Sequence, residues 1–377
     1  MTKKGVKIDK LIKSHKKKYP LPSFITKKPD FTYIISIAKK YKNNKNIILC
    51  GRGGSVSSFR AIYDALGSNK SVYIIDTIDP TYLKEVRTAC NKKDTIVIII
   101  SHSGETVDVL ENYFYFHDYK KLVITKKEGT LATIAKKEKV EHILHPEIGG
   151  RFTGTTVVNL LPSAIIGINI QKVWEGMNDI LDEEAFKLAV SLHKLERRGF
   201  TEVYVPIYAY ELQGFEEFIQ QIMHETVCKK RKGQTFLCYH APECHHHTHQ
   251  RFFGGRRNCI GLFIRVNAWE NEIHIKIPQG LKNIPLRNST LEALNNGTLG
   301  KNLNYEYIGT KLQADKQRIP NFTITLDKIN EHEVGQLLTL FQLVAIYSAY
   351  LRRVDPFTQP DVEEAKKISF ALRKHEV

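Results

Sequence analysis

Short, almost wholly apolar runs recur along the first half of the chain, and segments with helical character separate them. The runs cover residues 47–50, 72–75, 95–100 and 121–125. Strands that are apolar at every position, rather than at alternate positions, are typical of parallel sheets covered by helices on both faces. The pattern therefore predicts a doubly wound α/β layer.

A second set of apolar runs follows in the other half of the chain. Its candidate strands cover residues 202–207, 235–239, 259–266 and 321–326. Three further segments have the composition of helices rather than strands. They cover residues 155–170, 334–350 and 360–377.

The domain organisation follows from these two sets of strands. At 377 residues the chain has room for two domains of about 150 residues each. We predict the α/β class, with two similar doubly wound parallel-sheet domains over residues 1–178 and 179–377 and a C-terminal helix over 360–377. The first domain includes a lysine-rich start over residues 1–30.

The chain is strongly basic, with 56 Lys and Arg against 40 Asp and Glu and a formal net charge of +16. This balance favours an anionic partner: a nucleic acid, an acidic membrane or a phosphorylated small molecule. No stretch approaches the roughly 18 uninterrupted apolar residues of a membrane helix, and no helix-turn-helix or RNA-binding motif is present. We therefore expect neither a membrane nor a nucleic acid as partner.

The cysteines and the first residues bear on the compartment. The six cysteines include no CxxC pair and are too sparse for a disulfide framework. The first 20 residues are charged throughout and lack the apolar core of a secretory signal. We expect a cytoplasmic protein.

Two polar turns each follow a predicted strand and precede a predicted helix. Residues 51–55, the glycine turn, read Gly-Arg-Gly-Gly-Ser, which is neither a Walker loop nor a GxGxxG motif. This turn is either an anion site or a plain tight turn. Residues 101–106, the hydroxyl turn, read Ser-His-Ser-Gly-Glu-Thr. Three hydroxyls at a helix N-terminus favour phosphate binding over simple helix capping.

Three further segments carry residues with possible chemical roles. Arg151 follows two glycines before an apolar segment, where it either stabilises an oxyanion or lies on the surface. Gln221 and Glu225 are four residues apart and can face one ligand from a helix. The histidine loop, residues 244–249, contains four histidines and one cysteine. Adjacent histidines seldom converge on one ion, so acid/base work by one of them is favoured over a metal site.

These five segments, together with residues 355–366 (Asp-Pro-Phe-Thr-Gln-Pro-Asp-Val-Glu-Glu-Ala-Lys), occur in an order that resembles the phosphoglucose isomerase family. The resemblance runs from about residue 46 to 366. This family of aldose–ketose isomerases has the SIS fold, so the resemblance implies two SIS-type domains with a C-terminal helix that packs back on the active site. It also implies a homodimer with active-site residues that cross between subunits.

The resemblance assigns a role to each matching residue. Glu225 matches the base that moves a proton between C1 and C2 of the sugar, and Arg151 matches the arginine that stabilises the enediolate. His246 and Lys366 match the residues that open the sugar ring. The remaining matches bind the phosphate or line the sugar site. They are Ser101, Ser103 and Thr106 for the phosphate and Gly54, Ser55, Gln221 and Gln359 for the sugar.

The implied reaction is the reversible conversion of glucose 6-phosphate to fructose 6-phosphate, without a metal or an organic cofactor. Two alternatives remain open at this point: a bifunctional glucose/mannose-6-phosphate isomerase, and a non-catalytic SIS protein that binds sugar phosphates. The chain departs from the family pattern at several positions, including Gly104-Glu105 in the hydroxyl turn and His245 and His247 in the histidine loop. His102 stands in place of a lysine, Thr226 in place of a serine, and Arg52 in place of a small apolar residue.

Overall fold

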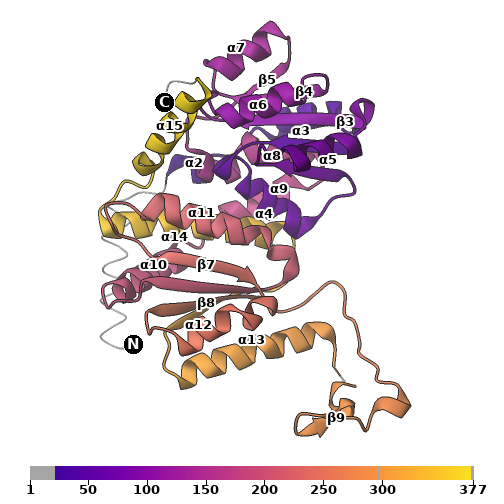
Figure 1. The fold of residues 1–377 in the computed structure, drawn as a ribbon, viewed down its shortest axis with the longest axis vertical. Coiled ribbons are helices and arrows are strands. Elements are labelled where there is room, and N and C mark those ends of the chain that lie inside the picture. Colours follow the sequence, from indigo (N-terminus) through magenta and orange to yellow (C-terminus); the bar gives the residue numbers. More distant parts are fainter. Residues whose placement is uncertain (1–21, 296, 375–377) are drawn as a thin grey trace.

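Two parallel sheets form the body of the protein and lie on opposite sides of a layer of helices (Figure 1). This computed structural model describes residues 22–295 and 297–374, so most of the lysine-rich start lies outside the described residues. The predicted α/β class with parallel sheets is confirmed.

The first sheet has the strand order β2-β1-β3-β4-β5, and every strand pair is parallel. Its strands are β1 (Asn46–Cys50), β2 (Ser71–Ile75), β3 (Thr95–Ser101), β4 (Lys120–Thr125) and β5 (Glu141–Leu144). Four of them coincide with predicted runs. The fifth was missed because two of its four residues, Glu141 and His142, are polar.

The strand order reverses between β1 and β3, which pair directly through Cys50 and Ile99. Because both strands run in the same direction, the glycine turn and the hydroxyl turn emerge next to each other at one edge of the sheet. A reversal of this kind leaves a crevice at the carboxyl ends of the strands, where ligands of open α/β sheets bind. The helices associated with this half of the protein are α2 (Ser23–Thr26), α3 (Phe31–Lys40), α4 (Ser57–Leu66), α5 (Pro80–Ala89), α6 (Val107–Tyr115), α7 (Thr130–Lys137), α8 (Val157–Ile165) and α9 (Ile170–Asn178).

The second sheet has the order β11-β8-β6-β7 and is also parallel throughout. All four predicted strands are present, as β6 (Glu202–Tyr208), β7 (Thr235–His240), β8 (Cys259–Val266) and β11 (Asn321–Leu326). The helices of this half are α10 (Asp182–Glu196), α11 (Gly214–Val227), α12 (Thr248–Gly254), α13 (Leu299–Lys316) and α14 (Glu331–Arg352).

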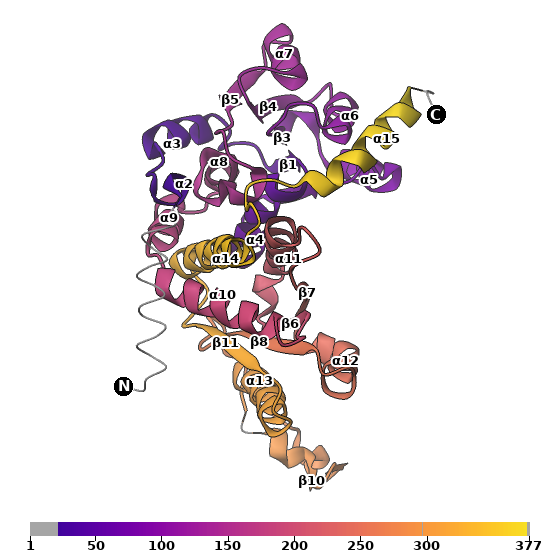
Figure 2. The ribbon, with the colours of Figure 1, turned by 90° about the vertical axis from the view of Figure 1, so that its left-hand side faces the viewer.

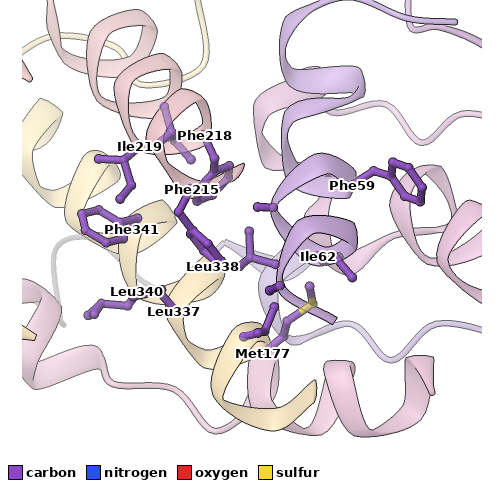
Figure 3. Packing of buried hydrophobic residues seen from close by; sticks show 14 of the residues in the cluster. Phe59, Ile62, Met177, Phe215, Phe218, Ile219, Leu337, Leu338, Leu340 and Phe341 are labelled. Atoms are coloured by element: carbon purple, nitrogen blue, oxygen red, sulfur yellow. The ribbon is translucent and has the colours of Figure 1, made fainter. Parts of the chain in front are cut away.

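Helix α14 is the centre of the layer between the sheets, where it packs against α9, α10, α11 and α4. Phe341 and Leu338 of α14 lie against Phe215 and Phe218 of α11 in a continuous apolar core (Figure 3). By length and composition α14 could cross a membrane, yet 83% of its most apolar window is buried inside the protein. It is the core helix predicted over residues 334–350.

Two segments differ from the predictions. The single helix expected over 155–170 is divided into a short 3₁₀ helix η3 (Gly150–Thr155), helix α8 and the start of α9. Gly167 adopts φ +95°, a left-handed conformation that ends α8, and Asn169 then caps α9. Residues 267–295, which include the antiparallel pair β9 (Pro285–Leu286) and β10 (Ser289–Thr290), project from the body and were not predicted.

The C-terminal helix forms as η8 (Pro360–Val362) and α15 (Glu363–Arg373), and α15 contains no buried residue. It extends beside the first half of the protein, where Arg373 pairs with Glu111 of α6 at 2.9 Å (Figure 2). The segment that reaches the candidate site is the one ahead of the helix, residues 355–359, which we call the C-terminal strap.

Candidate active site

Two glycine-rich turns from the first half of the protein meet backbone to backbone. A Cβ atom added at Gly54 would lie 2.1 Å from the backbone nitrogen of Arg151, a separation that no side chain tolerates. Ser55 is buried against Gly150 in the same contact. This close approach holds the backbone of Arg151 against the glycine turn. Gly54 is therefore required by the packing of the two backbones and not only by the conformation of the turn.

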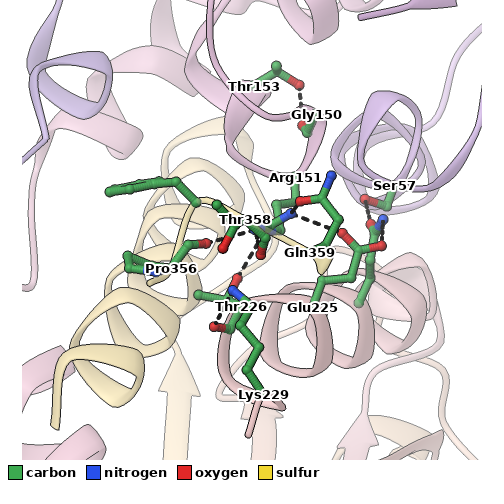
Figure 4. Close-up of polar contacts among 12 residues, drawn as sticks. Ser57, Gly150, Arg151, Thr153, Glu225, Thr226, Lys229, Pro356, Thr358 and Gln359 are labelled. Atoms are coloured by element: carbon green, nitrogen blue, oxygen red, sulfur yellow. Dashed lines mark hydrogen bonds and ion pairs between the residues drawn. The ribbon is translucent and has the colours of Figure 1, made fainter. Parts of the chain in front are cut away.

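Arg151 is the most fully bonded side chain of the site (Figure 4). Its Nη1 donates to Oε2 of Glu225 at 3.2 Å and to Oε1 of Gln359 at 2.8 Å. Its Nε donates to Oγ1 of Thr226 at 3.1 Å, and Nη2 donates to the carbonyls of Pro356 and Thr358. These bonds use all five N–H groups of the guanidinium, which is 3% exposed. Burial lowers the pKa of Arg151 while Glu225 opposes that shift, and an arginine remains charged in either case.

Glu225 lies on α11 and keeps one side open to solvent, with 37% of its side chain exposed. Its Oε1 accepts from Nε2 of Gln221 at 3.3 Å, and Oε1 of Gln221 accepts from the hydroxyl of Ser57 at 2.7 Å. Gln221 also touches the glycine turn, since a Cβ atom at Gly53 would lie 2.5 Å from Nε2 of Gln221. A chain of polar contacts therefore holds the carboxylate between the arginine and the glycine turn.

The C-terminal strap is held by two buried cations. Arg151 binds two of its carbonyls, and Nζ of Lys229 donates to the carbonyl of Asp355 as well as to that of Thr226 at 3.1 Å. Burial, followed by the nearby charge of Arg151, lowers the pKa of Lys229 to about 8. Arg151 and Lys229 thus tie the strap to α11 and place Gln359 beside Glu225.

The hydroxyl turn lies at the other side of the glycine turn. Oγ of Ser101 accepts from the backbone N–H of Gly104 at 3.1 Å and lies 3.0 Å from Oγ1 of Thr106. Oγ of Ser103 accepts from the N–H of Glu105, whose carboxylate turns away to Thr130. The backbone bond from Thr130 lowers the pKa of Glu105.

The N-terminus of α6, which follows the hydroxyl turn, has spare hydrogen-bond donors. The backbone N–H groups of Thr106, Val107 and Asp108 have no acceptor among the residues that the structure describes. Together with the hydroxyls of Ser101 and Thr106, these groups form a cradle for an anion.

The histidine loop lies beyond the second sheet, apart from this cluster. His245 packs against neighbouring side chains: its ring stacks on that of His249 with 3.8 Å between the ring centroids, and its Nε2 lies 3.0 Å from the hydroxyl of Tyr208. Burial lowers the pKa of His245. His246 is exposed, and its side chain forms no hydrogen bond with another described residue. No group of three or more His, Cys, Asp or Glu in the described part of the chain is arranged to hold a metal ion.

Lys366 also lies outside the cluster. It is on the exposed helix α15, with 63% of its side chain accessible, and its Nζ pairs with Glu363 at 2.8 Å. Residues 355–359 approach the site because Arg151 and Lys229 bind their backbone, whereas no residue of α15 is buried.

The structure thus brings Glu225, Gln221, Arg151 and Gln359 into one hydrogen-bonded group, with Gly54 and Ser55 packed behind it. Ser101 and Thr106 line the neighbouring cradle, while the hydroxyl of Ser103, in the same turn, accepts from the N–H of Glu105. Reasoning from the sequence missed two members of the group. They are Ser57, which binds Gln221, and Lys229, which binds the strap. Lys229 lies two residues beyond the end of α11, so helical spacing from Glu225 does not identify it.

The chemistry open to this group follows from its charges. A carboxylate that is partly exposed can accept and return a proton, while a fixed guanidinium beside it stabilises negative charge on a neighbouring oxygen. Because every N–H of Arg151 is already bonded, an incoming oxygen must replace Glu225 or Gln359 on Nη1. The group is therefore suited to proton transfer next to a developing oxyanion.

No family model matches the chain. Among curated proteins, the glucose-6-phosphate isomerase of Lactobacillus helveticus is 30% identical over 384 residues, which cover 92% of this chain and 84% of that protein. The probable glucose-6-phosphate isomerase of Methanococcus maripaludis is 29% identical, over 87% of this chain and 78% of that protein.

The fold is that of solved sugar-phosphate isomerases with SIS domains. A glucose-6-phosphate isomerase from Chlamydia trachomatis superposes with a TM-score of 0.75 at 16% identity, over 91% of this chain and 72% of that one. The sequence identity over nearly the whole chain, rather than the shared fold, decides the family. The chain belongs to the glucose-6-phosphate isomerase family.

Proposed function

We propose that the protein interconverts glucose 6-phosphate and fructose 6-phosphate, as a glycolytic enzyme of the cytoplasm. The observation that carries this proposal is the group of Glu225, Arg151 and Gln359 at the crevice between β1 and β3. A protein that only binds sugar phosphates has no need of a carboxylate held 3.2 Å from a buried guanidinium. The relatives at about 30% identity that carry the name of this enzyme support the same reaction.

In the proposed reaction the open-chain sugar lies between Glu225 and Arg151. The Glu225 carboxylate takes the proton from C2 of glucose 6-phosphate, and the electrons of that bond form the C1=C2 double bond of an enediolate. Negative charge then develops on O1, and Arg151 stabilises it. Protonated Glu225 returns its proton to C1 while the proton of O2 passes to O1, so that O1 becomes the C1 hydroxyl and O2 the carbonyl oxygen of fructose 6-phosphate.

Arg151 changes partners during this reaction. In the structure its Nη1 serves Glu225 and Gln359, so the sugar oxygen takes over one of these two bonds. This exchange of partners places the cation on the developing oxyanion.

Ring opening must come first, because glucose 6-phosphate is mainly cyclic. The proposed acid and base for this step are His246 and Lys366, and neither touches the Glu225 group within one chain. We propose a homodimer in which each chain supplies its His246 to the site of the other. The exposure of the His246 side chain, which has no hydrogen-bond partner among the residues the structure describes, supports this arrangement.

The test is a coupled assay of fructose 6-phosphate conversion by the purified protein. Glu225→Gln keeps the size of the side chain and removes its basicity, so we expect kcat to fall by about 10² or more. Glu217→Gln is the matched control, since Glu217 lies on the same helix and pairs with Arg60 instead. Equal activity of Glu225→Gln and wild type would refute the proposal. Mannose 6-phosphate in the same assay tests the bifunctional alternative, which predicts comparable rates with both aldoses.

A further inference from the structure

Arg52 is the residue of the glycine turn whose presence the reaction above does not explain. It follows β1 directly, and its Nη2 forms an ion pair with the carboxylate of Asp108. Asp108 is the second residue of α6, just after the hydroxyl turn. The guanidinium therefore spans the crevice where the strand order reverses, from the turn after β1 to the helix after β3.

The bonding of Arg52 is incomplete. Asp108 is the only partner of its guanidinium among the described residues, and its Nε is buried without a hydrogen-bond partner. A buried donor without an acceptor is unfavourable, and in native structures it calls for an explanation such as an absent ligand. Its side chain remains 30% exposed, so a ligand in the crevice can reach it.

The surroundings of Arg52 are suited to a phosphate. The cradle offers hydroxyls of Ser101 and Thr106 and the unpaired N–H groups at the start of α6. The hydroxyl turn itself contains no Lys or Arg, and Lys126, which lies beside it, interacts with Glu105. Asp108 is a carboxylate that opposes a dianion at the start of the helix.

We propose that Arg52 is a ligand of the substrate's phosphate group, an inference that rests on the proposed function. Arg52 donates two N–H groups of its guanidinium to phosphate oxygens. A planar guanidinium matches phosphate with two parallel hydrogen bonds, which a lysine cannot provide. Asp108 competes with the phosphate for the same cation and, from the first turn of the helix, repels it.

Arg52 could instead serve only to hold the glycine turn against α6 through its ion pair with Asp108. This structural role predicts different effects of substitution from a role as a phosphate ligand. If the pair only ties the two segments together, removal of either partner has the same effect. If Arg52 binds phosphate, removal of Arg52 weakens phosphate binding, whereas removal of the Asp108 charge strengthens it. The two variants Arg52→Met and Asp108→Asn therefore separate the two roles by the sign of their effects.

The experiment measures the inhibition constant of inorganic phosphate and kcat/KM for fructose 6-phosphate in the full-length protein. For Arg52→Met we expect the inhibition constant to rise about tenfold or more, since two charge-assisted hydrogen bonds are lost. We expect kcat/KM to fall by a similar factor, with partial recovery in Arg52→Lys. Asp108→Asn should lower the inhibition constant. Arg87→Met is the control, because Arg87 pairs with Asp118 away from the crevice at 2.8 Å.

Two results would overturn the inference. One is an inhibition constant for phosphate in Arg52→Met within a factor of two of the wild-type value. The other is a rise in that constant in Asp108→Asn as large as in Arg52→Met, which identifies a structural tie. If the wild-type protein does not convert fructose 6-phosphate, the proposed function fails. Calorimetric titration with inorganic phosphate still tests Arg52 in that case.

Discussion

Replacement of Arg151 by lysine tests how much the site depends on a guanidinium rather than on a positive charge. Lysine keeps the charge but offers three donors on one nitrogen, whereas Arg151 uses five N–H groups in five bonds. At least two of the five acceptors therefore lose their partner. A buried acceptor left unpaired costs about 1–3 kcal/mol, and the two buried acceptors are Oγ1 of Thr226 and the carbonyl of Pro356, so we expect the free energy of unfolding to fall by at most about 2–6 kcal/mol.

The same substitution should affect catalysis and the C-terminal strap. Loss of a positioned donor at a developing oxyanion lowers kcat by about 10²–10³. The carbonyls of Pro356 and Thr358 both depend on Nη2 of Arg151, so the strap should become accessible to protease in the variant. Denaturant unfolding, the coupled isomerase assay and limited proteolysis measure the three effects.

Arg87→Lys serves as the control for Arg151→Lys, because Arg87 lies in an exposed ion pair that contributes about 1 kcal/mol at most. The reasoning is refuted if Arg151→Lys unfolds at the wild-type denaturant concentration and keeps kcat within about threefold. A variant that is stable but inactive would show that Arg151 acts in catalysis and is not needed to hold the strap.

Two further predictions concern Lys229 and the proposed dimer. Folding lowers the pKa of Lys229 from 10.5 to about 8. Between pH 8 and pH 10.5 the unfolded chain therefore binds more protons than the folded one. The contribution of Lys229 to the free energy of unfolding should rise as the pH rises through that range. Denaturant unfolding of wild type and Lys229→Met at pH 7.5 and pH 10 checks this, and a difference that is constant or falls with pH contradicts it. If His246 crosses between subunits, a mixture of inactive Glu225→Gln and His246→Ala chains that are refolded together should recover activity. About half of the random dimers contain one chain of each kind, and each of these dimers has one intact site out of two, so about a quarter of the wild-type activity should return. Glu225→Gln mixed with Arg151→Lys should recover none, and no recovery in the first mixture would place His246 elsewhere.

The sequence predicted the parts of the fold where local pattern and burial agree. Strand β3 is buried at every residue, so its apolar run could not be mistaken. Strand β5 is at the edge of its sheet and has two polar residues in four, so no pattern marked it. The division of the 155–170 segment depends on the backbone of Gly167, which hydrophobic periodicity does not register.

The site was predictable only as a set of separate segments. Arg151 and Gln359 are 208 residues apart, and their contact exists because the strap returns to α11. The order of motifs indicated which residues to consider, but it could not indicate which ones meet within one chain. His246 and Lys366 show this limit, since both are exposed and lie outside the Glu225 group. The contact of Lys229 with the strap likewise depends on tertiary packing.

The central claim is that Glu225 moves a proton between neighbouring carbons of a sugar phosphate. Conversion of fructose 6-phosphate in D₂O, followed by NMR, tests this claim most directly. A carboxylate that holds the proton during the reaction exchanges it with solvent, so glucose 6-phosphate formed by the wild-type protein should carry deuterium at C2. Glu225→Gln should give neither product nor label at a comparable protein concentration. Conversion without any deuterium at C2, or labelled product formed at the wild-type rate by Glu225→Gln, would contradict the account.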